Sequence, residues 1–251
     1  MRRYIFTLLL LSAAVLSYAQ DVHVVFIGNS ITQGALLKNP GQDAPPARAR
    51  YYLSRQLPAD SVSMSNCGVS GMTTLDFLPA AGKLFERVCK AADAVAADKK
   101  TKLVFSISLG TNDSAEDVAF GAPVHPVQYY TNMKVIIDEL LARYPRSRAV
   151  VQYPVWYAPN CYNAARYLLS GQRRLHSYYA MIAKLAAHYI AALPGRVSTG
   201  DAGVWNIFRD HSTDYFTPEE GNAGTFYLHP NRQGADVLGR CWADAIMKAL
   251  K

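Results

Sequence analysis

The chain has 251 residues, of which 50% are apolar and 18% charged, and its formal net charge is +7. This composition is typical of a globular protein and excludes disordered and fibrous classes. The sequence has no repeat of fixed period and no basic stripe interleaved with aromatic residues, which argues against a solenoid, a propeller or a nucleic-acid face.

Residues 1–19 have the features of a signal peptide. A basic start precedes an apolar run over residues 5–16, and Ser17 and Ala19 supply the small residues that a signal peptidase reads. The apolar run is shorter than the ~20 residues that span a bilayer, so we predict export to the periplasm or beyond, without stable membrane insertion; an uncleaved anchor is the alternative. The mature domain, residues 20–251, would carry a net charge of +5, since two arginines and no acid are removed. Its four cysteines, at positions 67, 89, 161 and 241, could form up to two disulfides or remain buried thiols.

Strands and helices alternate along the mature chain. Short apolar runs predict strands, and longer segments with apolar residues three or four positions apart predict helices. Strands are predicted over residues 22–27, 62–66, 103–109, 149–155 and 197–200, and helices over 45–57, 74–97, 127–144, 168–192 and 234–250. Nearly continuous apolar strands separated by helices are typical of a parallel sheet between two helical layers. The predicted fold class is therefore α/β, a three-layer α/β/α sandwich with about five parallel strands in one domain.

Polar residues follow the first two predicted strands, at the sheet edge where ligands bind in folds of this kind. Ser30 comes directly after the first strand, at a helix start whose backbone N–H groups favour negative charge. Taken alone, a Ser at such a position is more often a helix cap than a nucleophile. The loop over residues 66–74 follows the second strand, and its glycines would let the backbone approach a reacting oxygen, although an ordinary connection is the simpler interpretation.

Two further segments carry candidate residues. Asn112 follows the third strand and could donate a side-chain N–H to an oxyanion, or belong to an ordinary turn. His229 lies just before the last helix, and a neutral imidazole can take a proton from a serine hydroxyl near pH 7, although a single His is more often structural. Residues 205–231 show little pattern and are predicted to form a long loop, which in a compact domain is usually functional or mobile.

Together these segments resemble the motif blocks of the SGNH hydrolases, also called GDSL esterases and lipases, over the whole mature chain. The blocks are residues 28–32 (GNSIT), 66–74 (NCGVSGMTT), 110–113 (GTND) and 229–231 (HPN). The resemblance implies a flavodoxin-like fold and a serine esterase that forms an acyl-enzyme without a metal or organic cofactor. It implies that Ser30 is the nucleophile and His229 the general base. The oxyanion hole would consist of the backbone N–H groups of Ser30 and Gly71 and the side chain of Asn112.

Two positions depart from the family pattern. Asn29 stands where the family usually has Asp, and both side chains can cap a helix locally. Phe226 stands three residues before His229, where the family usually has the Asp that orients the imidazole. Three possibilities remain: another carboxylate replaces it, a backbone carbonyl holds the ring in a Ser–His dyad, or the protein is inactive. The carboxylates available in the same segment are Asp210, Asp214, Glu219 and Glu220.

The expected substrate class rests mainly on the family resemblance, and less on particular residues of the chain. Tyr153, Trp156, Tyr157 and Trp205 could stack on sugar rings or belong to the core. These aromatics, export and the carbohydrate O-acetylesterases of the family favour deacetylation of a small-molecule or glycan ester. The alternatives are a lipase or lysophospholipase and a catalytically impaired glycan-binding relative. A phosphate-binding flavodoxin-like protein, with the backbone of residues 28–34 around the phosphate, would leave the Asn and His of the later blocks unexplained.

Overall fold

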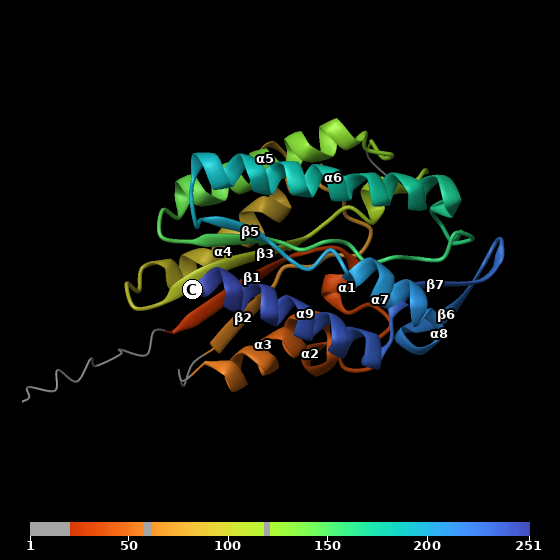
Figure 1. Cartoon of the computed structure of the whole chain (residues 1–251), viewed down its shortest axis with the longest axis horizontal. Helices are drawn as coiled ribbons and strands as arrows, with labels where there is room; N and C mark the ends of the chain where they lie inside the picture. The colour runs from red at the N-terminus through yellow and green to blue at the C-terminus, as the bar shows by residue number, and fades with distance from the viewer. Residues whose placement is uncertain (1–20, 58–61, 118–120) are drawn as a thin grey trace, which may run out of the picture.

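The computed structural model describes residues 21–57, 62–117 and 121–251. The predicted signal peptide, residues 1–19, lies outside the described residues. The described part is a three-layer α/β/α sandwich around a five-stranded parallel sheet (Figure 1), which confirms the predicted fold class. Within these ranges, no helix is both long enough and apolar enough to cross a membrane.

The sheet has the strand order β2-β1-β3-β4-β5, and every neighbouring pair is parallel. Strand β1 is buried along its whole length, which explains its apolar sequence without alternation. Gly28 at the end of β1 pairs with Ser108 of β3, and Phe26 pairs with Asn66 of β2, so the chain leaves all three strands at one edge. The strands are β1 (Val22–Gly28), β2 (Val62–Asn66), β3 (Lys102–Ser108), β4 (Arg148–Val151) and β5 (Val197–Thr199).

Helices cover both faces of the sheet (Figure 1). One face carries α4 (Lys83–Ala96), α5 (Pro126–Arg143) and α6 (Leu168–Ala192), and the other carries α2 (Pro40–Asp43), α3 (Pro45–Gln56) and α9 (Arg232–Leu250). Helix α9 presents small and large apolar residues to the sheet, and its Trp242 stacks on Phe26 of β1 with ring centroids 5.8 Å apart. Such a buried aromatic pair contributes more than its area alone.

Two predicted boundaries are wrong. The helix predicted over residues 74–97 begins only at Lys83, because Pro79–Ala81 form a short 3-10 turn before it. The strand predicted over residues 149–155 ends at Val151, and the proline three positions further on has no N–H for a strand ladder. All four cysteines are free thiols, and three of them are buried.

The segment predicted as a long loop, residues 205–231, is instead structured. It contains α7 (Val204–Asp210) and α8 (Ser212–Tyr215), followed by an antiparallel hairpin of β6 (Phe216–Gly221) and β7 (Gly224–Pro230). Alternate residues of β7 are buried, namely Phe226, Leu228 and Pro230. This period of two is a strand signal that was present in the sequence. The hairpin lies at the same end of the molecule as the short helix that follows β1 (Figure 1).

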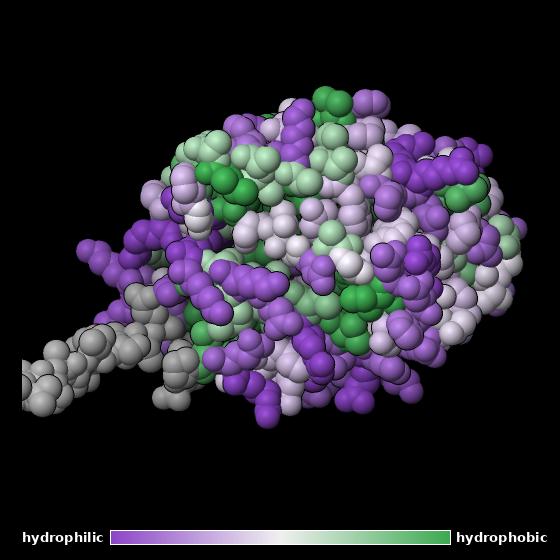
Figure 2. Space-filling model, in the orientation of Figure 1, coloured by the Kyte–Doolittle hydropathy of each residue, from purple (hydrophilic) through white to green (hydrophobic). Residues whose placement is uncertain are grey.

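The surface drawn in Figure 2 is mostly hydrophilic, and its hydrophobic residues form small separate patches. The exposed large hydrophobic residues of the described chain are spread over several elements, including Leu36, Val127 and Ile190. Single exposed apolar residues of this kind are normal for a globular protein and need no partner.

Candidate active site

Ser30 begins a one-turn helix, α1 (Ser30–Gln33), directly after β1. Asn29 caps this helix, since its Oδ1 accepts a hydrogen bond of 3.0 Å from the N–H of Ile31. The cap role needs only a side-chain oxygen, which Asn supplies as well as Asp. Gly28 permits the tight passage from strand to helix, because a Cβ there would overlap the side chain of Thr32. The N–H of Ser30, at the first helical position, has no acceptor within the helix and is available to a ligand.

The imidazole of His229 contacts Ser30 on one side and Glu219 on the other. His229 Nε2 lies 2.9 Å from Ser30 Oγ, and Nδ1 lies 2.9 Å and 3.0 Å from the two carboxylate oxygens of Glu219. The backbone N–H of His229 also donates to Glu219 Oε1, at 3.0 Å. With Nδ1–H donating to the carboxylate, Nε2 is free to accept the serine proton. Both side chains of the His229–Glu219 pair are largely buried, with exposed fractions of 13% and 15%.

The carboxylate comes from the strand opposite the position where the family resemblance expects an acid. Glu219 on β6 pairs with Phe226 on β7. Phe226 itself is only 1% exposed and packs in the core, where a carboxylate would be desolvated. The three other carboxylates considered from the sequence bond elsewhere or lie away from the imidazole: Asp210 pairs with Arg209, Asp214 lies near His211, and Glu220 accepts from Thr225. The imidazole is therefore held by a side-chain carboxylate and not by a backbone carbonyl.

Gly71 and Asn112 stand near Ser30 on the loops after β2 and β3. Gly71 has φ 80°, a left-handed conformation that favours glycine, although a Cβ would meet no atom within 4 Å. Asn112 begins the short 3-10 turn η2 (Asn112–Ser114). Its Nδ2 donates to the carbonyl of Met72 at 2.9 Å, which leaves the second N–H of the amide for a ligand.

Tyr167, just before α6, fixes the orientation of the Asn112 amide. The hydroxyl of Tyr167 donates to Asn112 Oδ1 at 2.7 Å. Burial raises the pKa of Tyr167, so the hydroxyl keeps its proton and remains a donor. An amide whose oxygen is held in this way keeps its N–H₂ group directed to the other side. Tyr167 was not among the residues predicted from the sequence, and its spacing from Asn112 gives no signal of the contact.

A buried carboxylate ties the two loops together. Asp113 Oδ1 accepts hydrogen bonds from both the N–H and the hydroxyl of Thr74, which follows the loop that carries Gly71. The same threonine hydroxyl accepts from Asn132 Nδ2 at 2.9 Å. Burial raises the pKa of Asp113 to about 6, because desolvation outweighs these hydrogen bonds. The position of Gly71 relative to Asn112 therefore depends on this contact.

The four predicted site residues line one open hollow of about 490 Å³ at the carboxyl edge of the sheet. Its other walls are formed by Ala35, Ser70, Asp117, Asn163, Ala164, Ala165 and Tyr167. No branched aliphatic residue, Met, Phe or Trp is among the described residues that line it. Of the aromatic residues considered as sugar platforms, none lines the hollow: Tyr153, Tyr157 and Trp205 are buried, and Trp156 packs on Phe216.

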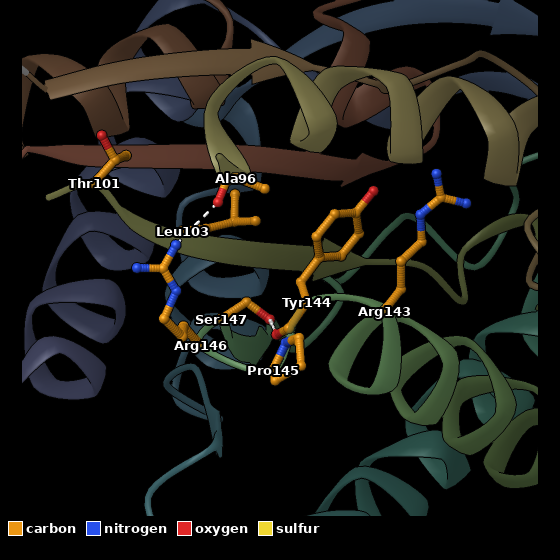
Figure 3. Close-up of a pocket in the computed structure, with 8 residues that line it drawn as sticks. All are labelled: Ala96, Thr101, Leu103, Arg143, Tyr144, Pro145, Arg146 and Ser147. Atoms are coloured by element: carbon orange, nitrogen blue, oxygen red, sulfur yellow. Dashed lines mark hydrogen bonds between the residues drawn. The ribbon is translucent and has the colours of Figure 1, made fainter. Parts of the chain in front are cut away.

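A second hollow, of about 90 Å³, lies at the opposite edge of the sheet beside Tyr144 (Figure 3). Its polar groups already have partners: Arg146 donates to the carbonyl of Ala96 at 3.0 Å, and Ser147 Oγ donates to the carbonyl of Tyr144 at 2.7 Å. No His, Asp or Glu is among the described residues that line it. Nowhere in the described ranges do three His, Cys, Asp or Glu side chains gather so that they could hold a metal ion.

The family profile of the GDSL-like lipases and acylhydrolases matches residues 26–237. This range contains the whole hydrogen-bonded group, from Ser30 to His229, and both loops beside it. A search of curated protein sequences finds no significant match.

Three solved structures are similar to the chain over about nine-tenths of its length. A carbohydrate acetylesterase from Sinorhizobium meliloti has 17% identity and a TM-score of 0.61, over 91% of this chain and 99% of its own. An aryl esterase from M. smegmatis has 18% identity and a TM-score of 0.58, over 90% and 99%. A lipase/acylhydrolase from Enterococcus faecalis has 19% identity and a TM-score of 0.57, over 90% and 95%. At such identities the likeness shows the fold alone.

Proposed function

Because the chain belongs to the GDSL-like lipase/acylhydrolase family and is an ester-hydrolysing enzyme, we propose that it acts as a serine esterase through Ser30, His229 and Glu219. The observation that carries this proposal is the continuous set of hydrogen bonds from Glu219 through the imidazole to Ser30 Oγ. A serine hydroxyl is a weak nucleophile unless a base takes its proton, and the base works best when a third group orients it.

In the first half of the reaction, Ser30 Oγ attacks the ester carbonyl and its proton passes to His229 Nε2. Glu219 accepts the Nδ1–H hydrogen bond and stabilises the imidazolium that forms. The carbonyl oxygen becomes an oxyanion, which accepts hydrogen bonds from the N–H groups of Ser30 and Gly71 and from Asn112 Nδ2. The C–O bond to the alcohol then breaks, the alcohol takes the proton from Nε2, and the acyl group stays on Ser30.

In the second half, water takes the place of the alcohol. His229 Nε2 accepts a proton from the water as its oxygen attacks the acyl carbonyl, and the same donors hold the second oxyanion. The C–O bond to Ser30 breaks, Ser30 Oγ regains its proton from the imidazolium, and the carboxylic acid leaves. No step of this scheme requires a metal or an organic cofactor.

We further propose that the enzyme is exported through the leader at residues 1–19 and removes O-acetyl groups from carbohydrate. The small and polar residues around the hollow support a short acyl group and a polar alcohol. A structural neighbour described as a carbohydrate acetylesterase is compatible with the same substrate class. A lipase or lysophospholipase is the alternative, but a long acyl chain would find only alanines and Tyr167 as apolar partners in the described wall.

The proposal predicts that activity does not rise with the length of the acyl chain. We expect kcat/KM for 4-nitrophenyl octanoate not to exceed that for the acetate ester, since the longer chain would gain none of the usual ~0.8 kcal/mol per buried CH₂. Steady-state assays of the acetate, butyrate and octanoate esters below their aggregation limits measure this. A rate that rises up to eight carbons would support the lipase alternative and contradict deacetylation.

Tyr167→Phe should lower kcat for an acetyl ester by about tenfold with little change in KM, because loosening an oxyanion donor costs less than the ~10² to 10³ of removing one. The matched control is Tyr157→Phe, whose hydroxyl is 2.9 Å from Ser114 Oγ and, among the described residues, makes no hydrogen bond with Asn112. A boronic acid that mimics the tetrahedral intermediate should bind the Tyr167→Phe variant correspondingly more weakly. Equal losses in the two variants would indicate a merely structural role.

A further inference from the structure

Two polar side chains at the mouth of the hollow, Asp117 and Asn163, take no part in the chemistry proposed above. They come from separate segments, one after η2 and the other between β4 and α6. We propose that they form a subsite for the alcohol half of the substrate and bind neighbouring hydroxyl groups of a neutral sugar. This inference rests on the proposed function, in which that alcohol leaves from Ser30.

Asp117 is positioned by hydrogen bonds of the adjacent backbone and by an ion pair of its own side chain. It has φ 59°, a left-handed conformation that Asp adopts more readily than most other non-glycine residues. The backbones of its neighbour Glu116 and of Arg166 exchange two hydrogen bonds, of 2.7 Å and 2.9 Å. Arg166 Nε lies 2.8 Å from Asp117 Oδ2. The carboxylate is nevertheless 66% exposed, so Oδ1 is available to accept a hydroxyl from a ligand.

Asn163 supplies the complementary group. Its Oδ1 accepts a hydrogen bond of 3.0 Å from the N–H of Ala165, which leaves Nδ2 as a donor. The loop that carries Asn163 is bonded to the turn of the β6–β7 hairpin, because Asn222 Nδ2 donates to the carbonyl of Asn163 at 3.2 Å. The hairpin that carries Glu219 and His229 thus also positions Asn163.

An acceptor and a donor that line the same hollow suit a pair of hydroxyl groups, since each hydroxyl both donates and accepts. An anionic sugar would find no compensating charge, because no Lys or Arg is among the described residues that line the hollow. Arg166 lies just outside, and its charge is balanced by Glu116 at 2.8 Å and by Asp117. The expected alcohol is therefore a neutral, hydroxyl-bearing sugar.

The test compares two esters with the same acyl group. One is a methyl glucoside that carries a single acetyl group beside free hydroxyls, and the other is 4-nitrophenyl acetate, whose alcohol has no hydroxyl to donate or accept once esterified. Asp117→Ala should lower kcat/KM for the sugar ester about tenfold, mainly through KM, because a hydrogen bond to a charged group is lost. The aryl ester should change less than about twofold. Asp210→Ala, at another exposed aspartate paired with arginine, is the control.

Asn163→Asp is the second variant, since it keeps an oxygen for the Ala165 N–H while it replaces the donor with an acceptor and adds a negative charge. It should show the same selective loss on the sugar ester. Equal losses on both esters, or no loss on either, would overturn the subsite. Wild-type turnover of the aryl ester without turnover of any monoacetylated glucoside would also overturn it, while the esterase proposal would stand. Failure of the wild type on both esters would contradict the proposed function itself, and the subsite with it.

Discussion

Ser30→Ala should lower kcat/KM for 4-nitrophenyl acetate at least ~10³-fold, by analogy with the loss of a triad member in serine proteases. The substitution removes the atom that would bond to the acyl carbon. The hydroxyl makes one side-chain hydrogen bond in the described structure, to His229 Nε2, so the fold should be unaffected. Circular dichroism and thermal unfolding of the variant check this independently of activity.

His229→Ala should cause a loss of similar size, and the double variant should be little worse than either single one, because residues that act as a unit are not additive. His211→Ala is the matched control, since this histidine is 53% exposed and is not among the described residues that line the hollow. Activity close to that of the wild type in either Ser30→Ala or His229→Ala would contradict the assignment of the nucleophile and its base.

Glu219→Ala should lower kcat about 10⁴-fold, the loss seen when the orienting acid of a serine protease is removed. The carboxylate accepts hydrogen bonds from Nδ1 and from the backbone N–H of His229. Without it, neither the orientation of the ring nor the position of the proton on Nδ1 is fixed. KM should change little, because Glu219 is not among the residues that line the substrate hollow.

Glu220→Ala is the control for this prediction, since Glu220 lies next along β6 and, within the described part of the chain, accepts only from the hydroxyl of Thr225. It should keep nearly full activity. If Glu219→Ala were as active as Glu220→Ala, the enzyme would work as a Ser–His dyad, and the contact between Glu219 and the imidazole would be incidental.

The general fold could be predicted from the sequence because β1 and β3 are buried on both faces. Their runs are apolar except for His23 in the first and two serines in the second, and each is followed by a glycine, Gly28 or Gly110, which makes them easy to recognise. Ser30 and Asn112 follow these strands directly, and the carboxyl ends of parallel strands meet at one edge. The position of these two side chains therefore follows from local sequence and topology together.

The sequence alone left four candidates for the carboxylate that orients His229. Glu219 reaches the imidazole because β6 and β7 form a hairpin with an irregular register between Phe216 and Pro218. A register shift of one residue decides whether Glu219 or Glu220 points to the histidine. The sequence does not predict this strand, because Pro218 and the two glutamates that follow it are not typical of strands. The contact is a property of the paired strands and not of either strand alone.

For the aromatic residues, the sequence suggested a role at the site that the structure does not support. Tyr157 and Trp205 follow strand ends, as a binding residue would, yet both are buried, at 1% and 9% exposure. Large aromatic side chains fill the space where helices cross the ends of strands, so their presence near a site in sequence does not predict contact with a ligand. Asp117 and Asn163, which line the hollow, belong to loops without a sequence pattern. Only the folded structure brings them to the same hollow.

The most direct test is to locate the covalent adduct of a fluorophosphonate, which reacts with serines that are activated by a neighbouring base. Peptide mass spectrometry of the labelled wild type should place one phosphonyl group on Ser30, and labelling should be nearly absent in His229→Ala. An adduct on another serine, or equal labelling of the wild type and His229→Ala, would contradict activation of Ser30 by this imidazole.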